Sequence, residues 1–177
     1  MARQKTFDDV AVAAAARDLF WQHGYAATSL AQLQEATGLS KSSLYESYGS
    51  KRGLFDRAIR SYLDEIIEPL LGPVESGEAG LGVYFGSLAR VFREAPPQIA
   101  RRGCLLLNTA MELDDLDAEA ARTVAAYRER VRAAFATADA ADPELLTAAQ
   151  IGLMVTSRLD PAAAASLADA LAASARS

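Results

Sequence analysis

The sequence predicts an all-α protein with an N-terminal three-helix head and a C-terminal helical bundle, about nine helices in all. Apolar residues recur three and four positions apart along most of the 177 residues, which is the period of a helix with one buried face. Strand signals are confined to short apolar runs. Alanine clusters at residues 13–16 and 162–165 are strong helix formers. A chain of this length can form a small head and a larger body, expected at residues 1–50 and 51–177.

The first helix is expected to end near His23, where Gly24 follows it. Thr6 can cap its start together with Asp9, which lies three residues on. A lone histidine cannot build a metal site, so His23 is expected to be a surface residue. The residues expected on the buried side are Phe7, Val10, Ala14, Leu19 and Phe20.

The next two helices carry the most informative pattern in the chain. Ser29 can cap the first of them, with Gln32 completing a capping box. Gly38 follows where a left-handed residue is needed, and Ser40 can cap a second helix over residues 41–48. Two helices joined by a short glycine turn form a helix-turn-helix, whose second helix enters the DNA major groove. An ordinary helical hairpin shares this pattern.

The polarity of the second helix favours DNA. Leu39 and Leu44 are left to hold the helix to the core. A helix packed on a protein partner would carry more large apolar residues on its outer face. Short hydroxyls with one lysine suit a helix close to base edges and phosphates. The residues expected to face outward are Lys41, Ser42, Ser43, Glu46 and Ser47.

Phenolic and cationic groups flank the end of this helix. The hydroxyls of Tyr45 and Tyr48 can donate to phosphate oxygens. Lys51 stands in the first turn of the next helix, which Ser50 can cap. A lysine there is unfavourable for the helix dipole but favourable when a phosphate binds beside it.

Residues 19–30 (LFWQHGYAATSL) and 40–55 (SKSSLYESYGSKRGLF) resemble the TetR family of bacterial transcriptional regulators nearly position for position. The resemblance covers about the first third of the chain. It implies DNA-backbone contacts from Ser40, Ser43, Tyr45, Tyr48 and Lys51. It implies base contacts from Lys41, Ser42, Ser43 and Ser47. The family often has an aromatic residue or histidine where Ser47 stands, and usually phenylalanine where Tyr48 stands.

The net charge of −5 first argues against a DNA-binding protein. However, residues 1–62 hold eight Lys/Arg against six Asp/Glu, whereas residues 63–177 hold ten against seventeen. The head is therefore basic by +2 and the body acidic by −7, as expected if only the head meets phosphate. Because the basic excess is small, two heads are expected to be needed for useful binding.

A long helix from Lys51 should end or bend at Pro69, and residues 72–80 form the clearest loop. Further helices are expected over residues 81–94 and from about 117 to 139, with an apolar run at 101–113 between them. Prolines are expected to open the last two helices, which begin at Pro143 and Pro161.

The last two helices are apolar on more than one face, so they either cap the subunit's own core or pair with a copy of themselves. Alanine-rich faces permit the close approach that a two-fold contact needs. The TetR resemblance implies a homodimer formed through these helices as a four-helix bundle. The residues expected at the interface are Leu146, Ile151, Leu153, Met154, Leu167 and Leu171.

The middle helices either fill a core or line a pocket for a small apolar effector. The residues expected to converge there are Ile66, Phe85, Leu88, Phe92, Leu107, Asn108, Met111 and Tyr127. Asn108 needs hydrogen-bond partners, since a buried unsatisfied amide costs about 1–3 kcal/mol. It is expected to orient a ligand or bond a neighbouring helix. The apolar neighbours of Cys104 favour an inert thiol over a redox sensor.

Other functions find little support in the sequence. It contains no histidine–nucleophile pair, metal-ligand cluster or glycine-rich phosphate loop, so no enzyme, cofactor or metal site is expected. The acidic run at residues 112–119 is expected to be a solvated helix start. No stretch approaches the roughly 20 apolar residues of a membrane span, and residues 1–10 lack an apolar signal core. A single cysteine suits a reducing compartment, so a cytoplasmic protein is expected.

The sequence therefore predicts a ligand-responsive transcriptional regulator that binds double-stranded operator DNA as a dimer. We expect a repressor of a palindromic operator that a small apolar effector releases. The alternative is a helical protein-interaction module without DNA binding.

Overall fold

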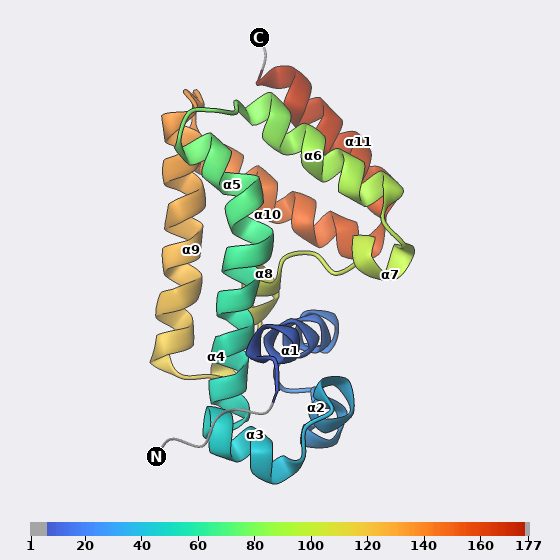
Figure 1. Cartoon of the computed structure of the whole chain (residues 1–177). Helices are drawn as coiled ribbons and strands as arrows, with labels where there is room; N and C mark the ends of the chain where they lie inside the picture. The colour runs from blue at the N-terminus through green and yellow to red at the C-terminus, as the bar shows by residue number, and fades with distance from the viewer. Residues whose placement is uncertain (1–6, 176–177) are drawn as a thin grey trace. The chain divides into compact units, whose positions relative to one another are not determined.

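The computed structural model describes residues 7–175, which are largely helical with no strand among them (Figure 1). The predicted all-α class is therefore confirmed. The chain divides into two compact units, Met1–Ile66 and Ile67–Ser177. The first unit extends beyond the expected head, because the helix after residue 50 packs with it. The functional division into residues 1–50 and 51–177 stays a prediction.

The described part of the first unit, residues 7–66, contains four α-helices around an aromatic core. They are α1 (Asp9–His23), α2 (Leu30–Thr37), α3 (Lys41–Tyr48) and α4 (Lys51–Tyr62). α1 packs on α2 and α4, and α3 packs on α4. The rings of Phe20 and Phe55 meet edge to face with their centroids 4.9 Å apart, and the Tyr25 ring centroid lies 5.0 Å from that of Phe55.

Side-chain caps fix where these helices begin. Ser29 and Gln32 form the predicted capping box: Ser29 Oγ accepts from the Gln32 amide at 3.2 Å, and Gln32 Oε1 accepts from the Ser29 amide at 2.8 Å. α1 is capped by Asp8, which accepts from the Val10 amide at 2.9 Å, while Thr6 lies outside the described residues. A side-chain cap typically contributes about 0.5–2 kcal/mol.

The buried side of α1 differs from the expected one. Of the expected residues only Phe20 is buried, and Val10 is largely exposed. An alanine run leaves the helical phase undetermined, since its members can lie on either face. The buried residues are Val12, Ala13, Ala16, Arg17 and Phe20.

The long helix was expected to end or bend at Pro69, and it does not end there. α4 is followed by a π-helical turn, η1 (Leu63–Ile67), and then by α5 (Glu68–Glu75). In a regular α-helix a proline lacks the N–H and its ring strikes the carbonyl four residues earlier. The wider π turn directly before Pro69 changes that hydrogen-bonding pattern. The loop expected at residues 72–80 accordingly begins after α5.

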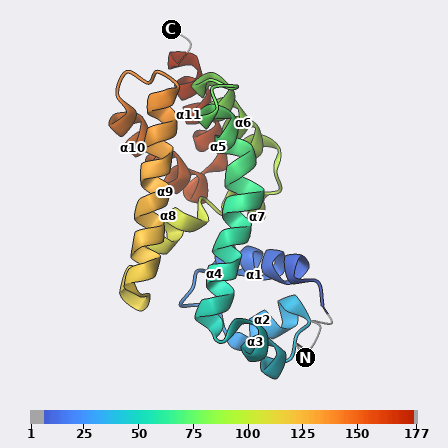
Figure 2. The same cartoon turned by 60° about the vertical axis from the view of Figure 1, so that its left-hand side comes forward.

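The second unit is a helical bundle. After α5 come α6 (Leu81–Glu94), α7 (Pro97–Ala100), α8 (Leu105–Ala110), the 3₁₀ turn η2 (Leu113–Asp115), α9 (Ala118–Thr137), α10 (Pro143–Leu159) and α11 (Pro161–Ser174). α6 lies along α11, and α9 packs against α5, α8 and α10 (Figure 1, Figure 2). The largest fully buried side chains include Phe85, Phe135, Leu105, Leu106 and Leu153. No helix within residues 7–175 is both long and apolar enough to cross a bilayer.

The described residues form eleven α-helices rather than about nine. The π turn separates α5 from α4, and α7 has only four residues. Pro143 and Pro161 are the first residues of α10 and α11, as predicted.

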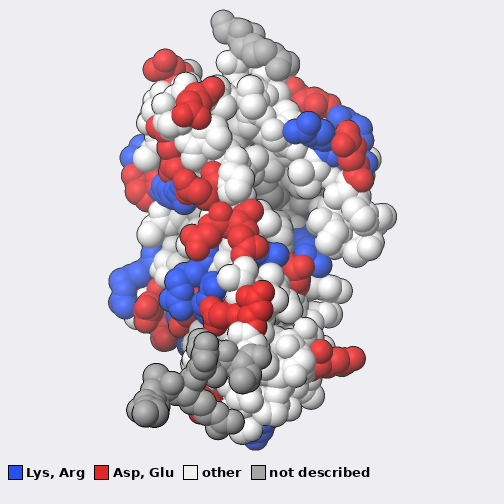
Figure 3. Space-filling view, viewed as in Figure 1, with Lys and Arg blue, Asp and Glu red and all other residues white. Residues whose placement is uncertain are grey.

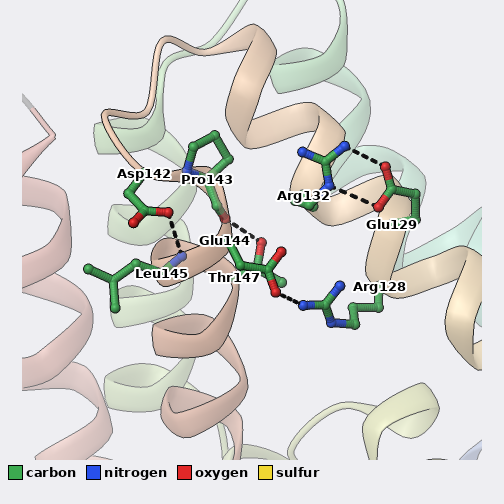
Figure 4. A network of polar contacts seen from close by, with 8 residues as sticks. All are labelled: Arg128, Glu129, Arg132, Asp142, Pro143, Glu144, Leu145 and Thr147. Atoms are coloured by element: carbon green, nitrogen blue, oxygen red, sulfur yellow. Dashed lines mark hydrogen bonds and ion pairs between the residues drawn. The ribbon is translucent and has the colours of Figure 1, made fainter.

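Polar contacts hold the corner between α9 and α10 (Figure 4). Asp142 accepts from the Leu145 amide at 3.0 Å and caps α10. Arg128 of α9 forms an ion pair with Glu144 in the first turn of α10. On the other side of α9, Arg130 donates to Glu68 at 2.6 Å and to Glu75 at 2.7 Å, which joins α9 to α5. These contacts are confined to the second unit.

Candidate nucleic-acid interface

Helix α3 presents a polar surface to solvent. Leu44 is buried and fixes the helix to the core of the first unit. Lys41, Ser42, Tyr45 and Glu46 are exposed, while Ser43 and Ser47 are half-buried. The preceding turn depends on Gly38, whose φ of +68° lies in the left-handed region. This arrangement is the glycine turn and outward-facing helix that the sequence predicted.

The hydroxyl of Ser40 organises the start of α3. Ser40 Oγ accepts from the Ser43 amide at 3.2 Å and so caps the helix. It also lies 2.9 Å from Ser42 Oγ and 3.0 Å from Ser43 Oγ. Three of the predicted DNA-contacting hydroxyls are therefore brought together in one cluster.

Tyr48 uses its hydroxyl within the head. The Tyr48 hydroxyl donates to Asp9 Oδ1 at 2.8 Å, and Arg57 Nε donates to Asp9 Oδ2 at 2.9 Å. Burial and the hydrogen bond to Asp9 raise the pKa of Tyr48 above its usual value. A phenol has one proton to donate, so a phosphate could receive it only if the bond to Asp9 broke. The exposed Tyr45 is better placed for such a contact.

Lys51 lies in the first turn of α4, beside an aromatic ring. Its Nζ is 4.4 Å from the centroid of the Tyr25 ring. Ser50 caps α4 by accepting from the Gly53 amide at 3.0 Å. A Cβ at Gly53 would lie 1.9 Å from the Tyr48 carbonyl oxygen, so only glycine allows the end of α3 to approach α4 this closely.

Two basic residues of this unit have structural roles that the sequence did not indicate. Arg17, nearly buried on α1, donates to Glu65 Oε2 at 2.7 Å and to Ser61 Oγ at 3.2 Å. The hydrogen bonds from Arg17 and Ser61 lower the pKa of Glu65. Arg57 forms an ion pair with Asp9. Arg17 lies on the buried side of α1. Its role could not be predicted because the sequence indicated a different buried side for this helix.

The surface shows no large region of one charge on the face drawn in Figure 3, where acidic and basic side chains interleave. The head as a whole has a basic excess of only +2. Attraction to phosphate should therefore depend on a few placed cations rather than on net charge.

The residues predicted to line an effector pocket are found in different environments. Phe85, Leu88, Phe92 and Tyr127 are buried in the second unit, whereas Leu107 and Asn108 are half-buried. Met111 is 86 % exposed, so it is not a pocket residue in this conformation. Ile66 is the last residue of the first unit.

Asn108 has a hydrogen-bond partner within its own subunit, and its expected role in orienting a ligand stays a prediction. Its Nδ2 donates to the Arg102 carbonyl at 2.9 Å, a bond to the loop before α8 rather than to another helix. Two other buried polar contacts lie in the second unit. The Gln150 amide donates to the Tyr84 hydroxyl at 3.2 Å, and the Cys104 thiol donates to the Tyr127 hydroxyl at 3.6 Å. Burial raises the pKa of Tyr84.

A groove of about 510 Å³ lies between the end of α6, α7 and the start of α11. Phe92 is the one member of the predicted effector set that lines it. Its lining includes apolar side chains such as Ala100 and Ala165 and the charged residues Arg101 and Asp160.

The predicted interface residues also divide by burial. Leu153 and Met154 are buried inside the subunit and cannot contribute to an outer surface. Leu146, Ile151 and Leu171 are half-buried, and Leu167 is exposed. Three large apolar side chains of α10 are exposed but were not among the predicted interface residues: Leu145, Val155 and Leu159.

A capped helix, a left-handed glycine turn and an exposed polar helix together form a helix-turn-helix, the motif of a class of DNA-binding proteins. Residues 12–58 match the family described as bacterial regulatory proteins, tetR family. Over 139 residues the chain is 34 % identical to the HTH-type transcriptional regulator YezE of Bacillus subtilis (strain 168), a region covering 76 % of this chain and 70 % of YezE. The chain belongs to the tetR family of bacterial regulatory proteins, and it is therefore a regulator rather than an enzyme.

Two further similarities extend this finding. Over 128 residues the chain is 36 % identical to the HTH-type transcriptional repressor ComR of Escherichia coli (strain K12), a region that covers 69 % of this chain but only 59 % of ComR. A cysteine-substituted form of the TetR family transcriptional regulator CifR, complexed with a 26-bp double-strand operator DNA, has the same fold with a TM-score of 0.67. The two are 26 % identical, over 97 % of this chain and 98 % of that one.

Proposed function

We propose that this protein is a cytoplasmic transcriptional repressor that binds double-stranded operator DNA as a homodimer. The observation that carries the proposal is the exposed polar face of α3, formed by Lys41, Ser42, Tyr45 and Glu46. That face offers no large aliphatic side chain to a protein partner, whereas its hydroxyl and ammonium groups suit base edges and phosphates, and its carboxylate suits a base amino group. The similar protein CifR was solved with operator DNA, which supports the same partner here.

The contacts with DNA divide into two kinds. Lys51 and Tyr45 would bind phosphate, since an ammonium beside a helix N-terminus favours an anion and a phenol can donate to it. Lys41, Ser42, Ser43 and Ser47 would face base edges. We leave the Tyr48 hydroxyl out of the proposed phosphate contacts because it donates to Asp9.

An apolar stripe on α10 supports a dimer. Leu145, Val155 and Leu159 are 67 %, 54 % and 74 % exposed. Together with the exposed Ala148 and Gly152 they recur three and four residues apart, so they share one helix face. A contiguous apolar face of this kind favours burial against another protein surface.

The proposed interface differs in part from the one expected from the sequence. Leu167 remains in it, and the small exposed residues Ala163 and Ala170 extend the same apolar character along α11. Leu153 and Met154 are removed, because they fill the core of their own subunit. A two-fold dimer would place two copies of α3 about 34–36 Å apart, one turn of duplex, on a palindromic operator.

The effector is proposed to be a small apolar molecule that enters the core of the second unit. Phe85, Leu88 and Phe92 supply apolar walls there, and the Tyr84–Gln150 and Cys104–Tyr127 pairs supply polar groups. A ligand shifts the protein between two states only by its difference in affinity for them, typically about 1–3 kcal/mol. Met111 is left out of this pocket because of its exposure.

The experiment that tests the proposal is a selection of duplexes from a randomised library with the purified protein. Enrichment of a palindrome supports an operator-binding dimer. Absence of any enriched duplex at low ionic strength contradicts the proposal and favours the protein-interaction module. Light scattering of the same sample tests the dimer separately, since a monomer mass at micromolar concentration contradicts it.

A further inference from the structure

Glu46 places a carboxylate on the surface that is proposed to meet a polyanion. It is exposed on α3 and lies four residues after Ser42 and three after Ser43, so it shares their helix face. Among the residues that the structure describes, it forms no hydrogen bond or ion pair. Its charge therefore faces whatever α3 binds.

The helix itself does not stabilise this charge. The positions three and four residues away are Ser42, Ser43, Gly49 and Ser50, and none of them is a cation that could pair with it. Glu46 stands near the C-terminal end of α3, where a negative charge is unfavourable for the helix dipole. An alanine there would serve the helix better.

The DNA major groove, in contrast, contains a hydrogen-bond donor that suits a carboxylate. Carboxylates accept hydrogen bonds from the exocyclic N4 amino group of cytosine. They are repelled by phosphates and by the carbonyl and ring-nitrogen acceptors of guanine. Serine hydroxyls can contact any base edge, because each one both donates and accepts. The hydroxyls of Ser42 and Ser43 are moreover already clustered on Ser40 Oγ.

We propose that Glu46 is a specificity-determining residue that accepts a hydrogen bond from a cytosine amino group at one position in each operator half-site. Its repulsion of the phosphate backbone also weakens binding to all other DNA. The inference rests on the proposed DNA-binding function and names one interaction within it.

The test compares wild-type protein with Glu46→Ala and Glu46→Gln in the duplex selection and in competition against a scrambled duplex. Glu35→Gln is the matched control, since Glu35 is an exposed glutamate on α2 and loses the same charge. Wild type and Glu35→Gln should enrich the same motif, with cytosine at one position per half-site. Glu46→Ala should lose that preference, bind scrambled duplex more tightly, and lower the ratio of specific to non-specific affinity roughly 5- to 150-fold for each half-site.

Three outcomes overturn the inference. If both Glu46 variants enrich the wild-type motif, the carboxylate reads no base. If Glu35→Gln changes specificity as much as Glu46→Gln does, the effect is one of net charge. If wild-type protein enriches no duplex at all, the proposed function itself fails, and the inference fails with it.

Discussion

The ammonium of Lys51 lies 4.4 Å from the centroid of the Tyr25 ring. Tyr25 belongs to the loop after α1, and its ring contacts the Phe20 and Phe55 rings of the core. A cation over an aromatic face gains about 0.5–1 kcal/mol at an exposed site. The core of the first unit therefore holds the flexible lysine beside the N-terminus of α4, where a phosphate is proposed to bind.

Lys51→Ala should weaken binding to every duplex by a similar factor, because a phosphate contact carries no sequence information. The slope of log affinity against log salt should fall by about one for each subunit. Fluorescence anisotropy at several salt concentrations measures both effects. Substitution of Ser43 or Lys41 should instead change the order of preferred operators. Identical behaviour of the two classes would contradict the roles assigned.

Tyr48→Phe and Tyr45→Phe should have opposite effects. The Tyr48 hydroxyl donates to Asp9, so its loss should lower the free energy of unfolding by about 0.5–1.5 kcal/mol. Operator affinity should then change little. Tyr45 is exposed, so the loss of its hydroxyl should weaken binding and leave stability unchanged. Thermal unfolding measures the stability of both variants, and fluorescence anisotropy measures their affinity for DNA. A large loss of affinity for Tyr48→Phe would show that the Tyr48 hydroxyl contacts DNA.

Gly53→Ala should strongly destabilise the first unit, because the new Cβ would lie 1.9 Å from the Tyr48 carbonyl. Gly86→Ala is the matched change in α6, where no atom lies within 4 Å of the added carbon. That variant should be stabilised by about 0.5–1 kcal/mol, since alanine favours a helix interior. Comparable melting temperatures for the two variants would show that α3 and α4 do not approach so closely.

The Arg17–Glu65 pair should make stability depend on acid pH. Hydrogen bonds from Arg17 and Ser61 hold the folded pKa of Glu65 below its usual 4.5. The pair therefore stabilises the folded chain above about pH 4.5, and the contribution is lost as the pH falls through the folded pKa. Glu65→Gln should lower the melting temperature at pH 7, and its difference from wild type should vanish on acidification. An equal deficit at all pH values would mean that charge is not involved; Glu35→Gln serves as the control without a partner.

Leu159→Asp should separate subunits, because it places a charge on the exposed apolar stripe of α10. Leu153→Ala should instead cost about 2–5 kcal/mol of stability without changing the mass in solution, since Leu153 is buried in its own subunit. Light scattering and thermal unfolding distinguish the two effects. A dimer that survives Leu159→Asp and Val155→Asp would place the interface elsewhere.

Local signals in the sequence were sufficient for α2, the glycine turn and the start of α3. Ser29 with Gln32, the left-handed Gly38 and the cap at Ser40 act within a few residues, so each could be predicted from spacing alone. Proline at the first turn of α10 and α11 was predictable for the same reason.

Features that depend on tertiary packing could not be predicted. The period of α10 marks Leu153 and Leu159 equally as apolar, and only the packing against α9 and α11 decides that the first is core and the second surface. The partner of Tyr48 is Asp9, 39 residues away, and no spacing rule indicates it. The phase of α1 was lost in an alanine run, which hid the role of Arg17.

Hydrogen exchange of the protein with and without a selected duplex tests most directly whether α3 enters DNA. Peptides covering residues 39–53 should gain protection when the duplex is added, and those covering α6 should change far less. Unchanged exchange throughout residues 39–53 in a saturated complex would contradict the central claim, because the DNA would then lie on another surface.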